Sequence, residues 1–434
     1  MNSMPKATQV IKCTCLAATL ACVAGNVAAQ GTQISGFGSI AGYHADSTQL
    51  GFRSDIAAPE EGYRGDFKIS DLSRLGLQIN HQFNKEFELV TQAVLQEEMV
   101  SSDLDRVKIA TLNYTPSASW LVRVGRFSPR IYFLSESRYI SYAHDTVYPV
   151  HDFYAQIPLS FVDGFDATYQ KRVGSTFLKT NFFAGQTHVV VDVVGVETEN
   201  EFDWLAGLNF EVEYGNWLYR ASYTQAQFEY TESQNVEPFL ELLANPGIIS
   251  PLKSLPNWQE AGVIKQAYSI SESRLNYASV AFEYRDFECQ VRGEFGKLTS
   301  ESDLAPDSTA GYLQYSYRSD VVTPFIIASA IKTDEGYQQQ TQPNPMLLGG
   351  VTQALGFDAA SAVVGVVDAL NVEYEQKSLA IGMRWDFDAN IAVKAQYERS
   401  WVEEDGGGLW IQERLAYNDS EVIDVMAFSI DWIF

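Results

Sequence analysis

Histidines, and the acidic residues beside them, are the side chains whose types and spacing come nearest to metal or hydrolytic chemistry. The chain has five: His44, His81, His144, His151 and His188. None lies in a Gly-x-Ser-x-Gly or His-Glu-x-x-His setting, the motifs of a hydrolase nucleophile and of a zinc protease. The pairs His144-Asp145 and His151-Asp152 could supply metal ligands, but two such pairs in an aromatic segment are a weak signal. We therefore expect no catalytic residue, no metal site and no cofactor.

Residues 129–158, which contain both of these pairs, mix charged and aromatic side chains densely. Prolines at both ends and in the middle interrupt regular structure. The ionisable residues of the segment are Arg130, Glu136, Arg138, His144, Asp145, His151 and Asp152. The aromatic residues are Tyr132, Phe133, Tyr139, Tyr142, Tyr148, Phe153 and Tyr154. The role of these charges depends on the secondary-structure elements that hold them. The rest of the sequence predicts those elements.

Sixteen segments with period-two alternation follow one another to the carboxy terminus. Their lengths suit tilted crossings of a membrane, which need about 9–11 residues each. We expect strands at 33–46, 71–83, 86–98, 106–115, 119–128, 159–171, 175–186, 202–214, 217–230, 274–285, 287–299, 309–318, 321–333, 374–387, 391–403 and 421–434. If the apolar runs 188–196 or 361–367 also pair as strands, an 18-stranded barrel is the alternative.

Each predicted strand has one lipid-like face and one polar face. In 379–387, for example, Leu379, Ile381 and Trp385 alternate with Arg384 and Asp386. An Arg or Lys facing the bilayer midplane costs about 2–4 kcal/mol, so these charges must face a watery lumen. Backbone groups in hydrocarbon must also be paired, which a closed sheet achieves. The pattern predicts an all-β fold, a transmembrane antiparallel β-barrel, and disfavours a soluble β-sandwich.

The connections between these segments alternate between tight turns and long loops. Turns such as Gly174 and Gly215-Asn216 are short, whereas 47–70, 129–158, 231–273, 334–373 and 404–420 are long. Outer-membrane barrels have short periplasmic turns and long extracellular loops. The last segment ends on an aromatic residue and is expected to close the barrel against 33–46. Its lipid-facing side chains are Phe428, Ile430, Trp432 and Phe434.

The amino terminus predicts export. Lys6 and Lys12 precede an uncharged stretch that ends in Val27-Ala28-Ala29, the pattern of a cleaved signal peptide. We expect residues 1–29 to be this signal and 30–434 to be the barrel. Without the signal the chain keeps one of its four cysteines, and 28 Lys and Arg against 55 Asp and Glu give −27. Nucleic acid is an unlikely partner for that charge.

Four segments carry a resemblance to a known family: residues 34–43 (Ile-Ser-Gly-Phe-Gly-Ser-Ile-Ala-Gly-Tyr), 73–77 (Ser-Arg-Leu-Gly-Leu), 121–127 (Leu-Val-Arg-Val-Gly-Arg-Phe) and Phe434. Together they resemble the sixteen-stranded trimeric porins, general and anion-selective, of Gram-negative bacteria. The resemblance implies a multi-pass, homotrimeric diffusion channel of the cell outer membrane for small hydrophilic solutes and ions. The expected partners are outer-membrane lipid, lipopolysaccharide and the barrel assembly machinery, which reads the final aromatic strand.

The same resemblance implies that residues 129–158 fold inward and narrow the pore. Loop acids then face basic wall residues, and the field between them orients dipolar solutes. Strict alternation turns Arg123 inward and Arg126 outward, unless a bulge or the strand end intervenes. The expected constriction residues of the loop are Arg130, Glu136, Arg138, Asp145 and Asp152. The expected wall residues are Arg74, Arg123 or Arg126, Arg220, Arg292 and Arg384.

Two alternatives stay open for the function. The apolar loops at 236–246 and 345–370 are compatible with a gated, substrate-specific channel, if one of them enters the lumen. A barrel enzyme is the less favoured class, given the histidine settings described above. Lumen-facing acids such as Glu211, Glu283 and Glu288 favour cations weakly.

Overall fold

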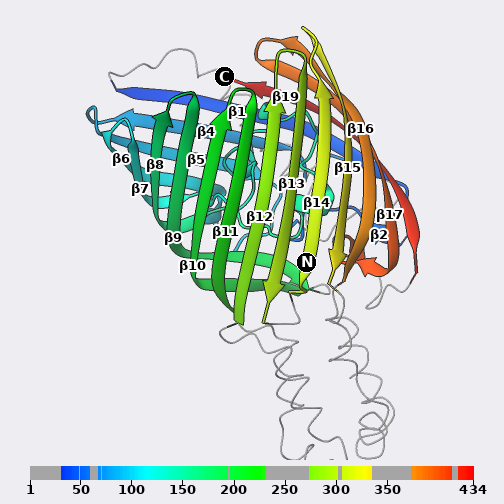
Figure 1. Cartoon of the computed structure of the whole chain (residues 1–434). Helices are drawn as coiled ribbons and strands as arrows, with labels where there is room; N and C mark the ends of the chain where they lie inside the picture. The colour runs from blue at the N-terminus through cyan, green and yellow to red at the C-terminus, as the bar shows by residue number, and fades with distance from the viewer. Residues whose placement is uncertain are drawn as a thin grey trace, which may run out of the picture.

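The computed structural model describes residues 31–47, 49–58, 67–69, 71–193, 196–230, 273–301, 305–334, 373–412 and 419–434. Sixteen long strands dominate it (Figure 1). They are β1 (Thr32–Ala45), β4 (Arg74–Gln82), β5 (Phe87–Gln96), β6 (Val107–Ser117), β7 (Trp120–Phe127), β8 (Val162–Val173), β9 (Thr176–Val193), β10 (Val196–Tyr214), β11 (Trp217–Tyr230), β12 (Ser273–Arg285), β13 (Cys289–Ser300), β14 (Ser308–Tyr317), β15 (Val322–Thr333), β16 (Tyr374–Asp388), β17 (Ile391–Gly407) and β19 (Glu421–Ile433).

Short elements occupy the connections between these strands. They are the strands β2 (Leu50–Gly51), β3 (Phe67–Lys68) and β18 (Ile411–Gln412), the 3₁₀ helices η1 (Asp103–Arg106), η2 (Ser135–Ser137) and η3 (Ser141–Ala143), and the single-turn helix α2 (His151–Tyr154). Among the described residues, no helix is long and apolar enough to cross a lipid bilayer.

The long strands form one closed antiparallel barrel. Each pairs with the next along the chain, and β19 returns to pair with β1, in a register from Phe37 opposite Ile433 to Ala45 opposite Val425. Within the part of the chain that the structure describes, only the two-residue β3 joins this sheet as an extra strand. The sixteen predicted strands are confirmed. Of the run 188–196, residues 188–193 lengthen β9 and Val196 begins β10 instead of a separate strand, and the run 361–367 lies outside the described residues.

The predicted division between an apolar outer face and a polar inner face is also confirmed. On β16, Ile381 and Trp385 are 50 % and 41 % exposed, whereas Ala380, next to Ile381, is buried. The barrel interior contains buried polar side chains such as Asp166, Asn209 and Lys394. Because large apolar side chains cover the outside of most strands, the outer surface suits hydrocarbon and the chain is a transmembrane barrel.

Barrel closure depends on glycines facing the carboxy-terminal rings. The Phe434 amide donates to the Gly36 carbonyl at 2.9 Å, and the Gly36 amide donates back at 2.8 Å. A Cβ atom at Gly36 would lie 2.2 Å from the Phe434 ring, and one at Gly38 would lie 2.2 Å from the Trp432 ring. Glycine at these two positions therefore lets the final aromatic side chains lie flat against β1.

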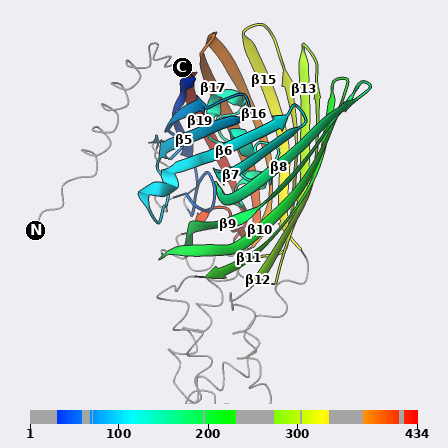
Figure 2. The ribbon, with the colours of Figure 1, turned by 90° about the vertical axis from the view of Figure 1, so that its left-hand side faces the viewer.

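The two rims of the barrel differ in the way that the turns predict. Gly174 and Gly215 adopt positive φ angles of 63° and 59° in tight turns at the rim where the carboxy terminus lies. The described long connection 129–158 begins at the opposite rim, where β9 and β10 extend as the longest pair of neighbouring strands (Figure 2). Long loops that enter the lumen must therefore come from this second rim.

Candidate functional site

The segment predicted to constrict the lumen, residues 129–158 (the inner loop), lies inside the barrel. Its side chains Ile131, Tyr132, Phe153 and Tyr154 are at most 3 % exposed. Helix α2 packs against β14, β15 and β16, far along the chain from β7, where the loop begins. Since polar backbone inside a barrel must find partners, the contacts of the loop with the wall show how it is held.

Basic wall residues hold the inner loop by its backbone carbonyl groups. Arg74 on β4 donates to the carbonyl of Arg138 at 3.2 Å. Arg220 on β11 donates to that of Tyr132 at 2.7 Å and to that of Arg130. Charge-assisted bonds of this kind are stronger than neutral ones. These two wall cations therefore help to position the inner loop.

Two further cations hold the middle of the loop in the same way. Arg384 on β16 donates to the carbonyls of Tyr142 and His144. Lys394 on β17 is fully buried and donates to the carbonyls of Ser141 at 2.6 Å and Thr146 at 3.0 Å. Cations on four wall strands thus fix successive stretches of the inner loop.

The second half of the loop is fixed through a buried carboxylate, Asp152. It accepts hydrogen bonds from Ser329 on β15 and from Gln376 and Ser378 on β16. Burial raises the pKa of Asp152 to about 6, although these hydrogen bonds act in the opposite direction. Asp152 is fully buried and is therefore an anchor of α2.

A wall carboxylate, Glu294 on β13, holds the start and the end of the loop together. It accepts the Phe133 amide at 2.9 Å and the hydroxyls of Tyr154 and Tyr312. Buried acceptors of this kind are satisfied only in one arrangement of the surrounding donors. Glu294 therefore selects the position of the loop.

One charged group that stays partly accessible is centred on Glu136, at 46 % side-chain exposure. Arg130 lies 3.0 Å from the Glu136 carboxylate and Arg123 of β7 lies 3.4 Å from it. Burial acts to raise the pKa of Glu136, but these two arginines and Lys179 together hold it below its ordinary value. Glu136 is therefore an ionised, solvent-facing carboxylate on the inner loop.

Wall residues complete this cluster on the side of β8 to β10. Arg123 also bonds Asp166 at 2.9 Å, and Arg130 lies 3.9 Å from Glu211. Lys179 on β9 lies 3.6 Å from the same Glu211 carboxylate. Acids and bases are thus interleaved in one ion-pair network that joins the inner loop to the wall. We name Glu136, Arg123, Arg130, Asp166, Lys179 and Glu211 the lumen cluster.

Arg292 and Asp145 lie elsewhere: Arg292 is on β13, and Asp145 of the inner loop faces β14. Arg292 forms an ion pair with Glu283 at 2.5 Å, and the two lie near the short-turn ends of their strands. Asp145 on the inner loop lies 3.5 Å from the Gln314 amide. Neither residue has a described ion pair with the lumen cluster.

Aromatic side chains seal the lumen on the side of β1, β16 and β17. Phe52, on the loop after β1, contacts Tyr148 and His151 of the inner loop and Trp410 after β17. Strands β2 and β18, which are next to Phe52 and Trp410 in the chain, pair with each other. Burial lowers the pKa of His151 to about 3, so the ring is neutral. This part of the lumen is packed like a protein core.

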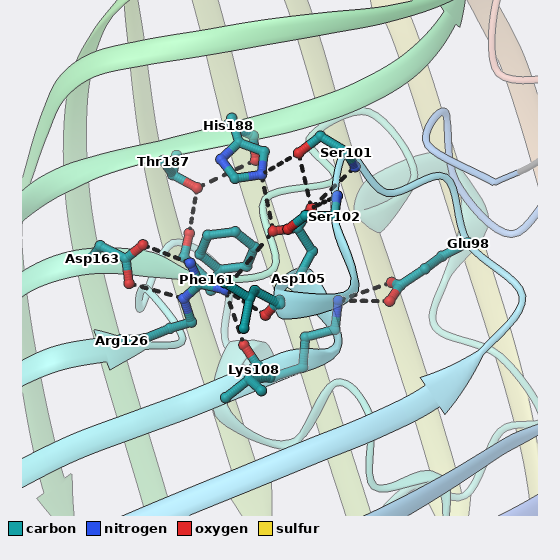
Figure 3. A network of polar contacts seen from close by, with 12 residues as sticks. Glu98, Ser101, Ser102, Asp105, Lys108, Arg126, Phe161, Asp163, Thr187 and His188 are labelled. Carbon is teal, nitrogen blue, oxygen red and sulfur yellow. Dashed lines mark hydrogen bonds and ion pairs between the residues drawn. The ribbon is translucent and has the colours of Figure 1, made fainter.

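Arg126, at the end of β7, lies in a separate network at the rim of long loops (Figure 3). It forms a bidentate ion pair with Asp163 at 2.8 and 2.7 Å, and its guanidinium stacks on Phe161 at 3.7 Å. It also donates to the carbonyls of Leu104 and Val107. Arg126 and Arg123 thus belong to different networks, and of these two arginines Arg123 contacts the inner loop.

The network continues to the loop between β5 and β6. Asp105 accepts hydrogen bonds from Ser101 and Ser102 and lies 3.0 Å from His188 Nε2 on β9. Burial acts to raise the pKa of Asp105, but these partners hold it below its ordinary value. The loop is thereby fixed over its own barrel.

A cavity of about 50 Å³ lies beside this network, among the loops of the same rim. Residues 54–58, 96–100, 158–161 and 188–190 contribute to its walls. Lys108 and Tyr139 also line it. Asp55, one of the lining residues, forms an ion pair with Arg138 at 2.6 Å.

Several of these functional side chains are absent from the sequence-based expectation. Lys394, Lys179 and Asp166 alternate with outward-facing apolar neighbours, so their inward orientation was readable from the sequence. Their partners were not, because they lie on other strands or on the loop. Within the described residues, no three His, Cys, Asp or Glu side chains are grouped so that they could hold a metal ion.

Comparisons with known proteins give the fold. No protein-family model matches the sequence, and no curated protein matches it either. Among solved structures, the model is similar to OmpF of Salmonella typhi in complex with daunomycin, at 11 % identity and a TM-score of 0.52 over 93 % of this chain and 97 % of that one. It is also similar to an anion-selective porin from Comamonas acidovorans, at 10 % identity and a TM-score of 0.50 over 93 % and 99 %. The predicted likeness to sixteen-stranded porins is confirmed at the level of the fold.

Proposed function

We propose that this protein is an outer-membrane porin, a passive diffusion channel for small hydrophilic solutes and ions. The observation that carries this proposal is the lumen cluster, in which the exposed acid Glu136 on an inward-folded loop faces Arg123 on the barrel wall and lies beside Arg130 of the same loop. Such an arrangement exposes solutes to charge without binding them tightly, which diffusion requires. The apolar outer face and the porin fold support the same conclusion.

The cellular setting follows from the proposed function. The protein is exported by residues 1–29 and resides as a homotrimer in the outer membrane of a Gram-negative bacterium, among lipid and lipopolysaccharide. The barrel assembly machinery recognises the final strand, whose Phe428 and Ile430 are about half exposed on the outer face. The proposed role is transport and not catalysis.

A gated channel is the second candidate, and the aromatic seal favours it. Phe52, Tyr148, His151 and Trp410 close one side of the lumen, and residues that fill a barrel lumen reduce its open cross-section. Solutes then pass on the opposite side of the lumen, next to the lumen cluster. The two candidates differ in the conductance of the resting protein.

Shortening residues 130–156 to a brief Gly-Ser linker tests the proposed channel. We expect single-channel conductance in planar bilayers to rise roughly three-fold or more, because pore conductance follows the open cross-section. A heat-dependent shift in gel mobility would verify that the variant is a folded barrel. Unchanged conductance in a folded variant would contradict the assignment of the inner loop as the constriction.

Glu136→Gln tests the lumen cluster specifically. The substitution removes the exposed acid but keeps its shape, so the cation-to-anion permeability ratio should fall roughly two-fold. The reversal potential across a KCl gradient measures this ratio. Glu86→Gln is the matched control, because Glu86 is exposed in a short turn outside the lumen. An equal shift in both variants would mean that the surface charge, and not the lumen cluster, sets selectivity.

A further inference from the structure

The cavity among the loops of the long-loop rim is a second concave site, apart from the lumen cluster. It is partly open and has a volume of about 50 Å³. None of the six residues of the lumen cluster lines it. A buried water needs about 10–15 Å³ on the same measure, so the cavity has room for about four waters. That volume suits a ligand of a few non-hydrogen atoms.

The lining of this cavity is acidic. The described residues that line it include one lysine, Lys108, and four carboxylates, Asp55, Glu97, Glu98 and Asp105. Three of the carboxylates have partners within the protein. Asp55 pairs with Arg138 at 2.6 Å. Glu98 accepts from Lys108 at 2.9 Å, and Asp105 lies 3.0 Å from His188 Nε2 (Figure 3). The lysine is thus already neutralised by Glu98, and the fourth carboxylate remains.

Glu97 is this fourth carboxylate. Within the described part of the chain, its side chain forms no hydrogen bond and no ion pair. Its Oε2 atom is buried without a hydrogen-bond partner, and so is Oε1 of the neighbouring Gln96, which also lines the cavity. Buried acceptors are normally satisfied, because an acceptor without a donor is destabilising. Two adjacent residues of the cavity therefore lack donors that a ligand can supply.

The remaining wall of the cavity is largely apolar. Met99, Val189 and Val190 line it, and Val190 is buried. Aliphatic side chains of this kind favour contact with carbon atoms over contact with a hydrated ion. The cavity thus combines one unpaired negative charge, two free acceptors and an aliphatic surface. A small cation that carries both N–H donors and an alkyl chain complements all three features.

We propose that this cavity binds a short primary alkylammonium ion. Its N–H groups donate to Glu97 Oε2 and Gln96 Oε1, and its alkyl chain contacts Met99, Val189 and Val190. A primary ammonium is charged at neutral pH and has several N–H donors, as the lysine side chain does. The site goes beyond the proposed channel function, because binding takes place among the rim loops and does not require transport.

Binding of n-propylammonium to the full-length protein, folded in detergent, tests the proposal. Saturation-transfer NMR of the ligand measures its affinity. Tetramethylammonium has the same charge but no N–H donor, and propanol has the alkyl chain but no charge. The wild type should bind n-propylammonium roughly ten-fold more tightly than either analogue, because charge-assisted hydrogen bonds are the stronger ones.

Two variants assign the binding to Glu97. Glu97→Gln removes the unpaired charge but keeps the shape of the side chain, so the affinity for n-propylammonium should fall roughly ten-fold. Asp103→Asn is the matched control. Asp103 is a fully exposed acid of the same connection and does not line the cavity, so this variant should bind as the wild type does. The heat-dependent shift in gel mobility verifies that both variants are folded barrels.

Three results would overturn the site. The first is a folded Glu97→Gln variant that binds n-propylammonium as tightly as the wild type. The second is an equal loss of affinity in Asp103→Asn, which would mean that surface charge attracts the ligand. The third, measured on the wild type alone, is equal binding of tetramethylammonium. None of these measurements involves conductance, so a failure of the site leaves the proposed channel standing.

Discussion

Replacing Lys394 with methionine is expected to destabilise the barrel by about 3–5 kcal/mol, the cost of leaving one partner of a buried ion pair without the other. Lys394 Nζ lies 2.9 Å from the Asp431 carboxylate, and both side chains are fully buried. The same ammonium donates to the carbonyls of Ser141 and Thr146 on the inner loop. The substitution therefore removes a charge partner and two loop anchors together.

A double variant separates these two effects. In Lys394→Met/Asp431→Leu neither charge remains, so most of the lost stability should return. The loop carbonyls stay without their donor, so the open-channel current noise should stay above that of the wild type. Urea unfolding in detergent measures the stability, and planar-bilayer recording measures the noise.

Lys377→Met is the matched control, because Lys377 is an exposed lysine of the neighbouring strand β16. Surface substitutions usually change stability by less than about 0.5 kcal/mol. If Lys394→Met had the same stability and the same open-channel current noise as this control, Lys394 would not hold the inner loop.

Asp152→Asn is expected to remove part of the pH dependence of stability. The pKa of Asp152 is raised to about 6 by burial, against an ordinary value of 3.8. The folded wild type therefore binds a proton more tightly than the unfolded chain does. Its stability falls as the pH rises from about 4 to about 6, by roughly 2–3 kcal/mol. Asparagine has no charge to bury and should not show this loss.

Thermal unfolding in detergent between pH 3 and pH 8 measures the effect, as the difference between the two proteins. Taking the difference cancels the contribution of carboxylates that do not interact with Asp152. Glu398 interacts electrostatically with Asp152, so its titration contributes to the difference. Asp152→Ala is the contrasting variant. It leaves Ser329, Gln376 and Ser378 without their acceptor and should be less stable at every pH. Parallel pH curves for the wild type and Asp152→Asn would contradict the raised pKa.

Local patterns were sufficient to predict the barrel wall. Alternation along 379–387 specified which side chains of β16 face lipid, because neighbouring strand residues must point to opposite sides. The same rule separated Arg123 from Arg126, although the expected constriction set kept both. Glycines in the turns at 174 and 215 marked the short rim, because positive φ angles there exclude most other residues.

The candidate site was only partly predictable, for a reason that Arg220 illustrates. Its inward orientation follows from alternation, and it was expected to face solutes. In the structure it donates to two carbonyls of the inner loop, 88 and 90 residues away along the chain. An inward cation can meet a solute, an acid or a backbone carbonyl, and the period of a strand does not distinguish these partners.

By itself, then, the sequence determined a transmembrane β-barrel, its sixteen strands and the segment rich in charge and aromatic rings. These are properties of neighbouring residues, and the two environments of lipid and water select them directly. Only the tertiary structure decided which of the charges anchor the inner loop and which stay accessible at Glu136. Lys394 and Ser141 are 253 residues apart and meet because the barrel closes and the loop returns across it. Contacts of that kind depend on strand register around the whole ring, which no local stretch of sequence specifies.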